Sequence, residues 1–239
     1  MSADRFPDVM VLAAGLGKRM RPLSETTPKP LIEGAGQPLI DRVVAAAHAE
    51  GATNFVVNAH HHADQIRAHV LELETSIAGT RFQLSLEEGA PLDTGGGIKR
   101  ALPQLGTDPF LVMNADSFWP LGRDRPLERL IERFDAERTD MVLLCVHPRD
   151  AVGFRRSHDF CLDLRGRITK DMGAPVIYAG VALVIREVFV GVKDNVFSFY
   201  DLIERSLDDG RLAGVALDAP WFHVGDVQSI AQAEQISQQ

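Results

Sequence analysis

The sequence predicts an α/β fold, and two patterns predict it. Five short apolar runs, each bounded by polar or turn-forming residues, have the length of buried β-strands; they are residues 9–13, 55–58, 82–86, 110–113 and 141–146. Segments with apolar residues at helical spacing separate most of these runs, and such alternation is typical of parallel strands covered by helices. We therefore expect a Rossmann-like, mixed but mainly parallel sheet with helices on both faces.

Four segments predict the helices. The first has apolar residues at positions 39, 40, 43, 44 and 47, and Gly51 follows it where a helix commonly ends in a left-handed conformation. The second runs through Ile66, Val70 and Leu73, and the third spans residues 127–134. A final helix is expected from about Gln228 to the end of the chain.

The second half of the chain has a different pattern. Residues 160–164, 177–185 and 212–217 resemble strands, with fewer helical segments between them, which predicts a mixed extension of the sheet. No Pro/Ser-rich linker, low-complexity tract or internal repeat divides the sequence. The simplest interpretation is one domain over residues 1–239.

Length and composition exclude several classes of protein. The chain has 239 residues, of which 45% are hydrophobic and 24% charged, as in ordinary globular proteins. A formal net charge of −8 argues against a general nucleic-acid or membrane-surface binder, which would show a basic excess. No apolar stretch approaches the roughly 18–20 residues that span a bilayer, and the first residues lack the layout of a secretory signal. Because Cys145 and Cys161 are too few for a cysteine zinc site, we expect buried or free thiols in a reducing cytoplasm.

A glycine-rich, basic segment follows the first predicted strand. It reads AAGLGKRMRP over residues 13–22, and PKP follows at residues 28–30. Glycines let backbone N–H groups approach an anion, and residues 15–30 carry four basic side chains against one acidic, a local charge of +3. The dinucleotide-binding fingerprint requires glycine where this chain has Met20, and the P-loop requires Ser or Thr where it has Arg19. A solvated basic turn is the alternative to a polyphosphate site, and the adjoining PKP favours the phosphate site.

Together these motifs resemble the signature of the sugar-1-phosphate nucleotidyltransferases, which join a nucleoside triphosphate to a sugar 1-phosphate. Further motifs follow in that family's order: DTGGG at 93–97, NAD at 114–116, YAG at 178–180 and WFHVG at 221–225. The resemblance covers essentially the whole chain and is strongest to the short uridylyltransferases that act on N-acetylmuramate 1-phosphate in peptidoglycan recycling. It implies the glycosyltransferase-A-like nucleotidyltransferase fold, with a nucleotide-binding half at about 1–115 and a sugar-phosphate-binding half at about 116–239.

The resemblance also implies the reaction: a sugar phosphate oxygen attacks the α-phosphorus of the triphosphate, and pyrophosphate leaves. No protein nucleophile is needed, so catalysis consists of positioning two anions and neutralising their charge. Arg19 suits the β- and γ-phosphates because a guanidinium can bind two phosphate oxygens, and Lys29 suits the α-phosphate or the sugar phosphate. We expect the nucleotide to contact Ala13, Ala14, Gly15, Gly17, Lys18, Arg19, Glu88, Thr94, Gly95 and Gly96.

A divalent cation is the expected cofactor, Mg²⁺ in the first place with Mn²⁺ as the alternative. Asp116 follows a predicted strand at the carboxyl edge of the sheet, where open α/β folds bind ligands, although an Asp there can equally form a turn. Many relatives have Asp where this chain has His223, and imidazole suits transition metals better than Mg²⁺. We expect Asp116 as the main ligand, with His223 or Asp226 as the second.

Glu88 is expected to recognise the nucleobase. A carboxylate only accepts hydrogen bonds, which favours UTP, dTTP or GTP over ATP and CTP, provided that Glu88 rather than Glu87 points inward. The glycines of residues 95–97 should let the ribose or backbone approach closely, with the Thr94 hydroxyl as a donor.

The resemblance places four residues at the sugar phosphate: Lys29, Asn114, Tyr178 and Gly180. Lys170 could approach the sugar phosphate as well, although the Glu-Lys-Pro context of that role is absent. The histidines at positions 60, 61, 62 and 69 lack ordered ligand spacing, so we expect a loop and a helix start there rather than a metal site.

The leading hypothesis is a cytoplasmic, Mg²⁺-dependent enzyme that joins UTP to a sugar 1-phosphate, with N-acetylmuramate 1-phosphate as the best single choice. The alternatives within this class are a mannose-1-phosphate guanylyltransferase and a glucose-1-phosphate thymidylyltransferase. A non-catalytic nucleotide-sugar sensor is the alternative outside it, motivated by His223. No nucleic-acid or membrane partner is expected, and the sequence leaves the choice between monomer and homo-oligomer open.

Overall fold

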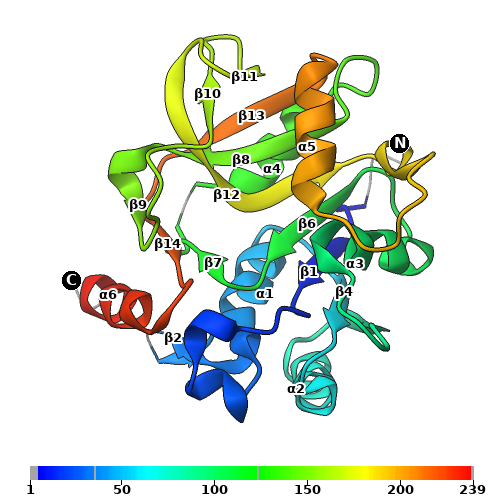
Figure 1. Cartoon of the computed structure of the whole chain (residues 1–239), viewed down its shortest axis with the longest axis vertical. Helices are drawn as coiled ribbons and strands as arrows, with labels where there is room; N and C mark the ends of the chain where they lie inside the picture. Colours follow the sequence, from blue (N-terminus) through cyan, green and yellow to red (C-terminus); the bar gives the residue numbers. More distant parts are fainter. Residues whose placement is uncertain (1–4, 35, 123, 238–239) are drawn as a thin grey trace.

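A nine-stranded mixed sheet forms the centre of the molecule (Figure 1). The computed structural model describes residues 5–34, 36–122 and 124–237, with side chains as far as residue 232. Four parallel neighbours come first, in the spatial order β6-β1-β4-β5, and they are β1 (Val9–Leu12), β4 (Asn54–Ala59), β5 (Arg81–Leu86) and β6 (Phe110–Asn114).

The long strand β12 (Ala174–Val184) joins the two parts of the sheet, because it pairs antiparallel with β6 and also with β8 (Met141–Val146). Strand β13 (Leu212–Leu217) then pairs parallel with β8. At its beginning β12 also pairs with β10 (Phe160–Leu162), which in turn pairs with β11 (Ile168–Thr169).

Helices cover both faces of this sheet. Helices α1 (Leu39–Ala49), α2 (Ala63–Ser76) and α4 (Pro126–Arg133) share one apolar core with the sheet, whereas α3 (Asp93–Ala101) and α5 (Phe199–Asp208) share the other. Successive strand side chains point to opposite faces, so Val9 and Val11 of β1 enter the first core and Met10 enters the second. Buried apolar residues at both faces explain why the strands read as continuous apolar runs in the sequence.

Smaller elements surround the carboxyl edge of the large sheet. A three-stranded sheet contains β7 (Ser117–Phe118), β14 (Trp221–His223) and β9 (Ala151–Val152), and β2 (Glu33–Gly34) pairs with β3 (Gln37–Pro38). Helix α6 (Val227–Ser237) closes the chain. The 3-10 helices are η1 (Lys18–Met20), η2 (Leu23–Glu25), η3 (Lys29–Leu31), η4 (Leu102–Gln104), η5 (Pro148–Asp150) and η6 (Arg186–Phe189).

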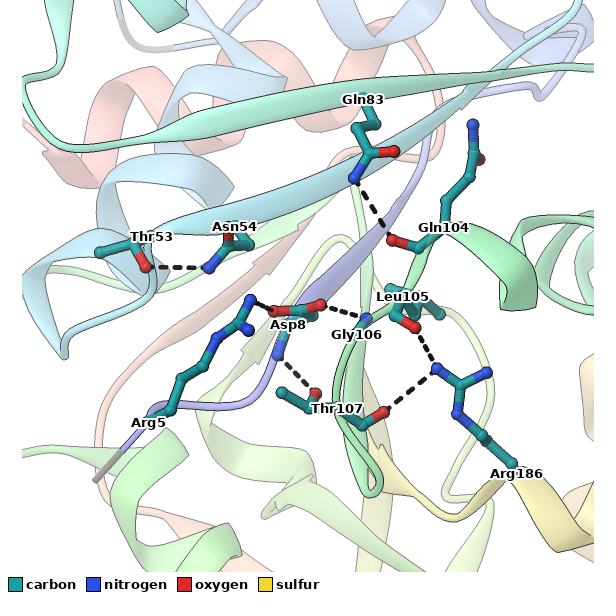
Figure 2. Close-up of polar contacts among 10 residues, drawn as sticks. All are labelled: Arg5, Asp8, Thr53, Asn54, Gln83, Gln104, Leu105, Gly106, Thr107 and Arg186. Carbon is teal, nitrogen blue, oxygen red and sulfur yellow. Dashed lines mark hydrogen bonds and ion pairs between the residues drawn. The ribbon is translucent and has the colours of Figure 1, made fainter. Parts of the chain in front are cut away.

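Polar contacts close the opposite, amino edge of the sheet, as Figure 2 shows. The Asp8 carboxylate pairs with Arg5 at 2.8 Å and accepts the Gly106 N–H, while the Asp8 N–H donates to the Thr107 hydroxyl at 2.9 Å. The Arg186 guanidinium donates to the backbone carbonyls before β6, including that of Leu105. These bonds fix where β1 and β6 begin, and so they fix where both strands end.

The predicted α/β architecture, with helices on both faces and a mixed extension, is confirmed. The predicted strands and helices all form, and Gly51 follows α1 with φ +116°. Helix α3 was not predicted, because its sequence DTGGGIKRA contains three consecutive glycines. Cys145 and Cys161 are both buried and free, and no helix in the described part of the chain is long and apolar enough to cross a membrane.

Candidate active site

The carboxyl ends of the four parallel strands meet at one edge of the sheet. Residues 13–18 follow β1, Glu87 follows β5, and Asp116 lies two residues beyond β6. Strand β12 runs in the opposite direction, so Gly180, just before the residues that pair with β6, reaches the same edge beside Asn114. Sequence segments far apart in the chain therefore converge where ligands bind in open α/β folds.

Two adjoining cavities lie at this edge. The first has a volume of about 640 Å³ and is lined mainly by the segment after β1 and by the ends of β4, β5 and β6. The second has a volume of about 420 Å³ and lies between β12, β14, α5 and the 153–159 loop. They share one wall, formed by Leu12, Arg19, Thr94, Asn114 and Gly225.

The glycine-rich segment forms a tight turn that presents its basic side chains. Gly17 has φ +60°, and its carbonyl accepts hydrogen bonds from the Met20 N–H and the Ser24 hydroxyl, both at 2.8 Å. Met20 is buried in the small apolar cluster formed with β7 and β14, which explains why a large apolar residue stands there. The anchoring of Met20 leaves Lys18 and Arg19 exposed, and both line the first cavity with Ala13, Ala14 and Gly15.

Lys29 and Asp116 form an ion pair in the wall of the first cavity. The Lys29 ammonium donates a hydrogen bond to Asp116 Oδ2, and the side chains keep only 12% and 23% of their accessible surface. Burial alone would raise the pKa of Asp116. The charges of Lys29 and His223 and the hydrogen bonds from Lys29 and Ser117 outweigh burial and hold this pKa below its usual value. Asp116 is therefore an anionic ligand donor at neutral pH.

His223 lies close to Asp116, whereas Asp226 is engaged by other protein groups. His223 Nδ1 is 3.4 Å from the Ser117 hydroxyl, which also lies 3.4 Å from Asp116 Oδ1. Burial lowers the pKa of His223, and the neighbouring Asp116 charge opposes this effect. The Asp226 carboxylate instead caps α6 through the Ser229 N–H at 3.0 Å and pairs with Arg155 at 2.5 Å. Both Asp226 oxygens hold protein groups, so Asp226 would have to exchange these contacts to bind a metal, and its expected role stays a prediction.

Glu87, not Glu88, points into the protein. Glu87 is 4% exposed; its Oε1 accepts a hydrogen bond from Asn58 at 2.7 Å, and its Oε2 accepts the Leu92 N–H at 3.1 Å. Asn58 in turn accepts the Ala13 N–H at 2.7 Å. Glu88 is exposed and does not line either cavity. The expected role of Glu88 in base recognition is corrected for this reason.

The glycine run after Asp93 lets helix α3 pack closely against residues 195–197. A Cβ on Gly95 would lie 2.3 Å from the Phe197 ring, and one on Gly96 would lie 2.1 Å from the Asn195 carbonyl oxygen. Residues 195–197 cover Gly95 and Gly96 on that side, and the expected contact of these glycines with the nucleotide stays a prediction. Thr94 lines both cavities, and its hydroxyl accepts the Phe199 N–H at 2.9 Å.

Three of the four residues expected at the sugar phosphate, Asn114, Tyr178 and Gly180, line the second cavity, whereas Lys29 lines the first. Asn114 packs directly against Gly180, where φ is +78° and a Cβ would lie 2.8 Å from Asn114 Nδ2. Tyr178 lines the same cavity, but its hydroxyl is buried and has no hydrogen-bond partner in the described part of the structure. Burial, together with the nearby Cys145 thiol, raises the pKa of Tyr178. The Tyr178 hydroxyl therefore faces the core rather than a ligand.

Sequence reasoning missed one wall of the second cavity. Phe154, Arg155, Arg156 and Asp159 line it from the loop between β9 and β10. The dipeptide Arg155-Arg156, beside an aromatic residue and outside any helical or strand pattern, was the available signal.

The histidines and Lys170 lie outside the chemistry of the site. His61 and His62 contact the Ser24 and Glu25 carbonyls at 3.3 and 3.0 Å, so they hold the loop after η1 against the start of α2. His69 pairs with Asp41 at 2.5 Å. Lys170 pairs with Asp208 on the surface at 2.6 Å.

The described residues contain no group of three or more His, Cys, Asp or Glu side chains that could hold a metal ion. Asp116, with His223 beside it, is thus a small donor set that substrate oxygens and water would have to complete. Mg²⁺ bound by one or two carboxylates together with phosphate oxygens and water has this character, so the donor set fits such an ion.

Comparison with known proteins identifies similar sequences. Residues 9–189 match the family model of the MobA-like NTP transferase domain. The chain is 40% identical over 228 residues to an N-acetylmuramate alpha-1-phosphate uridylyltransferase of Caulobacter vibrioides, covering 94% of each chain. It is 30% identical over 231 residues to the protein of that name in Neisseria meningitidis, covering 95% of this chain and 97% of the relative.

Solved structures share the fold at lower identity. HddC from Yersinia pseudotuberculosis, complexed with GMP-PN, has a TM-score of 0.74 at 21% identity and covers 97% of this chain and 100% of its own. The UTP-bound UGPase of Acinetobacter baumannii has a TM-score of 0.73 at 16% identity, with 97% and 93% covered.

Proposed function

The chain belongs to the family of MobA-like NTP transferase domains, and from this premise we propose that it joins UTP to N-acetylmuramate α-1-phosphate, releasing pyrophosphate. The observation that carries the proposal is the 40% identity, over 94% of both chains, to the uridylyltransferase of Caulobacter vibrioides. The protein is a sugar-1-phosphate nucleotidyltransferase, and its two adjoining cavities suit a reaction between two substrates.

The triphosphate would occupy the first cavity and the sugar phosphate the second. Backbone and basic side chains of residues 13–19 line the first cavity, which supports phosphate binding there. Residues of the second half of the chain supply most of the second cavity. This division supports one domain with a nucleotide-binding half at about 1–115 and a sugar-phosphate-binding half at about 116–239.

The protein would act by positioning and by charge. Arg19 belongs to the wall shared by the cavities, so its guanidinium can hold phosphate oxygens of the triphosphate while the sugar phosphate lies alongside. Lys29 places an ammonium in the wall beside Asp116, where it can offset the negative charge that builds up on the α-phosphate. Asn114 and Thr94 can orient the reacting oxygen from the same wall.

We extend the proposal to a divalent cation, Mg²⁺ before Mn²⁺, held by Asp116 with His223 at its side. When bound, such a cation neutralises phosphate charge and draws the two substrates together. The short donor set supports an ion that arrives with the nucleotide rather than one held permanently. The two free cysteines support a reducing compartment, in which we place the enzyme: the cytoplasm.

Pyrophosphate release tests the proposal. Five nucleoside triphosphates would be combined with N-acetylmuramate, N-acetylglucosamine, mannose and glucose 1-phosphates, with Mg²⁺ or Mn²⁺. We expect the fastest release from UTP with N-acetylmuramate 1-phosphate. Faster release from GTP with mannose 1-phosphate, or from dTTP with glucose 1-phosphate, would assign those activities instead. Tight nucleotide-sugar binding without release in any mixture would support a sensor.

A further inference from the structure

We propose that Arg155 and Arg156 form a carboxylate-binding subsite in the second cavity and select sugar phosphates that carry an acidic substituent. The inference rests on the proposed function and deepens it. N-acetylmuramate differs from N-acetylglucosamine by a lactyl ether, which adds one carboxylate and one methyl group. A protein that discriminates between the two sugars must recognise that group.

Both arginines come from one loop and line the second cavity but not the first. Their guanidinium-bearing side chains are 72% and 68% exposed, so their donors are accessible to a ligand. A guanidinium has five N–H donors in a planar fork that matches a carboxylate. The loop thus supplies donors in the part of the cavity where sequence motifs predicted none.

Each arginine is oriented by one acidic residue. Arg155 Nη2 lies 2.5 Å from Asp226 Oδ2, and Asp226 is itself fixed by capping α6. Arg156 Nη2 lies 2.9 Å from Asp159 Oδ1, and Asp159 Oδ2 accepts the Tyr178 N–H at 3.1 Å. The Asp159 side chain is only 3% exposed. Both carboxylates therefore restrain the arginine side chains. A side chain that is already held in its binding geometry loses less conformational entropy when a ligand binds.

An aromatic surface adjoins the Arg156 guanidinium. The Arg156 guanidinium carbon lies 5.4 Å from the centre of the Phe154 ring, and that ring packs against Trp221 at 6.1 Å between centroids. Trp221 is fixed by a hydrogen bond from its Nε1 to the Ala179 carbonyl at 3.0 Å. A rigid apolar surface beside cationic donors matches the methyl and carboxylate groups of a lactyl ether.

The test compares two substrates that differ only in the lactyl group. Initial rates with UTP would give kcat/KM for N-acetylmuramate 1-phosphate and for N-acetylglucosamine 1-phosphate, for the unchanged protein and for Arg155→Met, Arg156→Met and the double variant. Methionine keeps a long apolar stem and removes the charge. We expect the ratio of the two kcat/KM values to fall about tenfold or more in the double variant, mainly through KM for the lactyl substrate.

Arg138→Met is the matched control, because Arg138 is 84% exposed, pairs only loosely with Asp135 at 3.7 Å and lines neither cavity. Its ratio should stay within about twofold. Arg155→Lys combined with Arg156→Lys should recover part of the preference, since lysine keeps the charge without the fork. Thermal unfolding would confirm that each variant is folded.

Three results would overturn the inference. An unchanged ratio in the double variant would show that other groups recognise the lactyl ether. An equal or greater kcat/KM for N-acetylglucosamine 1-phosphate in the unchanged protein would show that no lactyl selection exists, while the nucleotidyltransferase function stands. Absence of turnover with both substrates would overturn the proposed substrate as well.

Discussion

At the scale of single residues, Lys29 and Asp116 depend on each other. Each side chain is mostly buried, and each removes the cost of the other's buried charge. A change at one position therefore alters the ionic state of the other, so each variant reports on the pair.

Asp116→Asn is expected to lower kcat/KM by about 100-fold or more, because it removes the carboxylate that we propose as the cation ligand and leaves Lys29 unpaired. Pyrophosphate release at saturating Mg²⁺ measures the effect. Asp150→Asn, which alters a surface pair with Arg149, should stay close to the unchanged protein. Full turnover by Asp116→Asn in Mg²⁺ would refute the role of Asp116 as the cation ligand.

Glu87→Gln and Glu88→Gln should behave differently although the residues are neighbours. Both Glu87 oxygens accept hydrogen bonds, so an amide there must turn one donor toward another donor. We expect a loss of about 1–3 kcal/mol in unfolding free energy and a raised KM for UTP, because Asn58 holds Ala13 in the first cavity. Urea unfolding and steady-state rates measure the two effects. Glu88→Gln should change neither, and equal behaviour of both variants would contradict the network.

Single residues show where sequence reasoning succeeds and where it ends. Asn114 and Asp116 could be placed because they follow a strand whose direction the pattern predicted. The choice between Glu87 and Glu88 could not be made from the sequence, because neighbouring side chains beyond the strand end point in different directions. The hydrogen bond from Asn58, on another strand, selects Glu87 as the inward residue. The ion pair of Asp226 with Arg155 could not be predicted for the same reason, because Arg155 belongs to a loop that the pattern does not position.

At the scale of elements, helix α3 shows that packing overrides propensity. Three consecutive glycines cost about 1 kcal/mol each relative to alanine in a helix. The helix forms nevertheless, because the absence of Cβ atoms lets residues 195–197 lie directly against it, with the Gly95 and Gly96 N–H groups bonded to the Phe197 carbonyl. A propensity argument counts only the cost, so it predicts a loop there.

Gly96→Ala should therefore destabilise the protein, although alanine is the better helix former. The new Cβ would lie 2.1 Å from the Asn195 carbonyl oxygen, so the backbone of the covering segment must shift. We expect a loss of about 2 kcal/mol or more, measured by urea unfolding. Gly122→Ala, which meets nothing within 4 Å, should change stability by less than about 0.5 kcal/mol. A more stable Gly96→Ala protein would contradict the observed packing.

Glu50 connects the end of α1 to the start of α4 and makes stability depend on pH. Burial raises the pKa of Glu50 from 4.5 to about 6, although its carboxylate accepts the Glu128 N–H at 2.9 Å. The pKa of Glu50 is thus higher in the folded state than in the unfolded state. The contribution of protonated Glu50 to the free energy of unfolding is therefore complete below about pH 4.5 and is lost as the pH rises through about 6.

Glu50→Gln should remove this loss, since glutamine still accepts the Glu128 N–H and does not ionise. The variant should gain about 1–2 kcal/mol over the unchanged protein between pH 4.5 and pH 7.5. Urea unfolding at both pH values measures the difference. A difference that is independent of pH would contradict the raised pKa.

At the scale of the whole molecule, the two functional halves share one sheet. Strand β12 pairs with β6 of the first half and with β8 of the second, and the buried Trp119 and Trp221 belong to one apolar core. The absence of a linker was the only sequence evidence that the two halves form one domain. The strands β6 and β8 that pair with β12 are distant from it in the sequence, so no local pattern predicts this pairing. The halves are therefore expected to unfold together.

Urea unfolding followed by tryptophan fluorescence and by far-ultraviolet circular dichroism should give one common midpoint. We expect the two unfolding curves to coincide because neither half can complete the sheet without β12. Two separated midpoints would show that the halves are independent domains.

The wall shared by the two cavities also bears on how the product inhibits the enzyme. A nucleotide-sugar contains the nucleoside monophosphate part of one substrate and the sugar phosphate of the other. It can therefore lie across both cavities and keep the contacts of each substrate, apart from those to the departed pyrophosphate, without the entropy cost of two separate binding events. We expect the product to compete with the triphosphate and with the sugar phosphate alike, so that accumulating product inhibits its own synthesis.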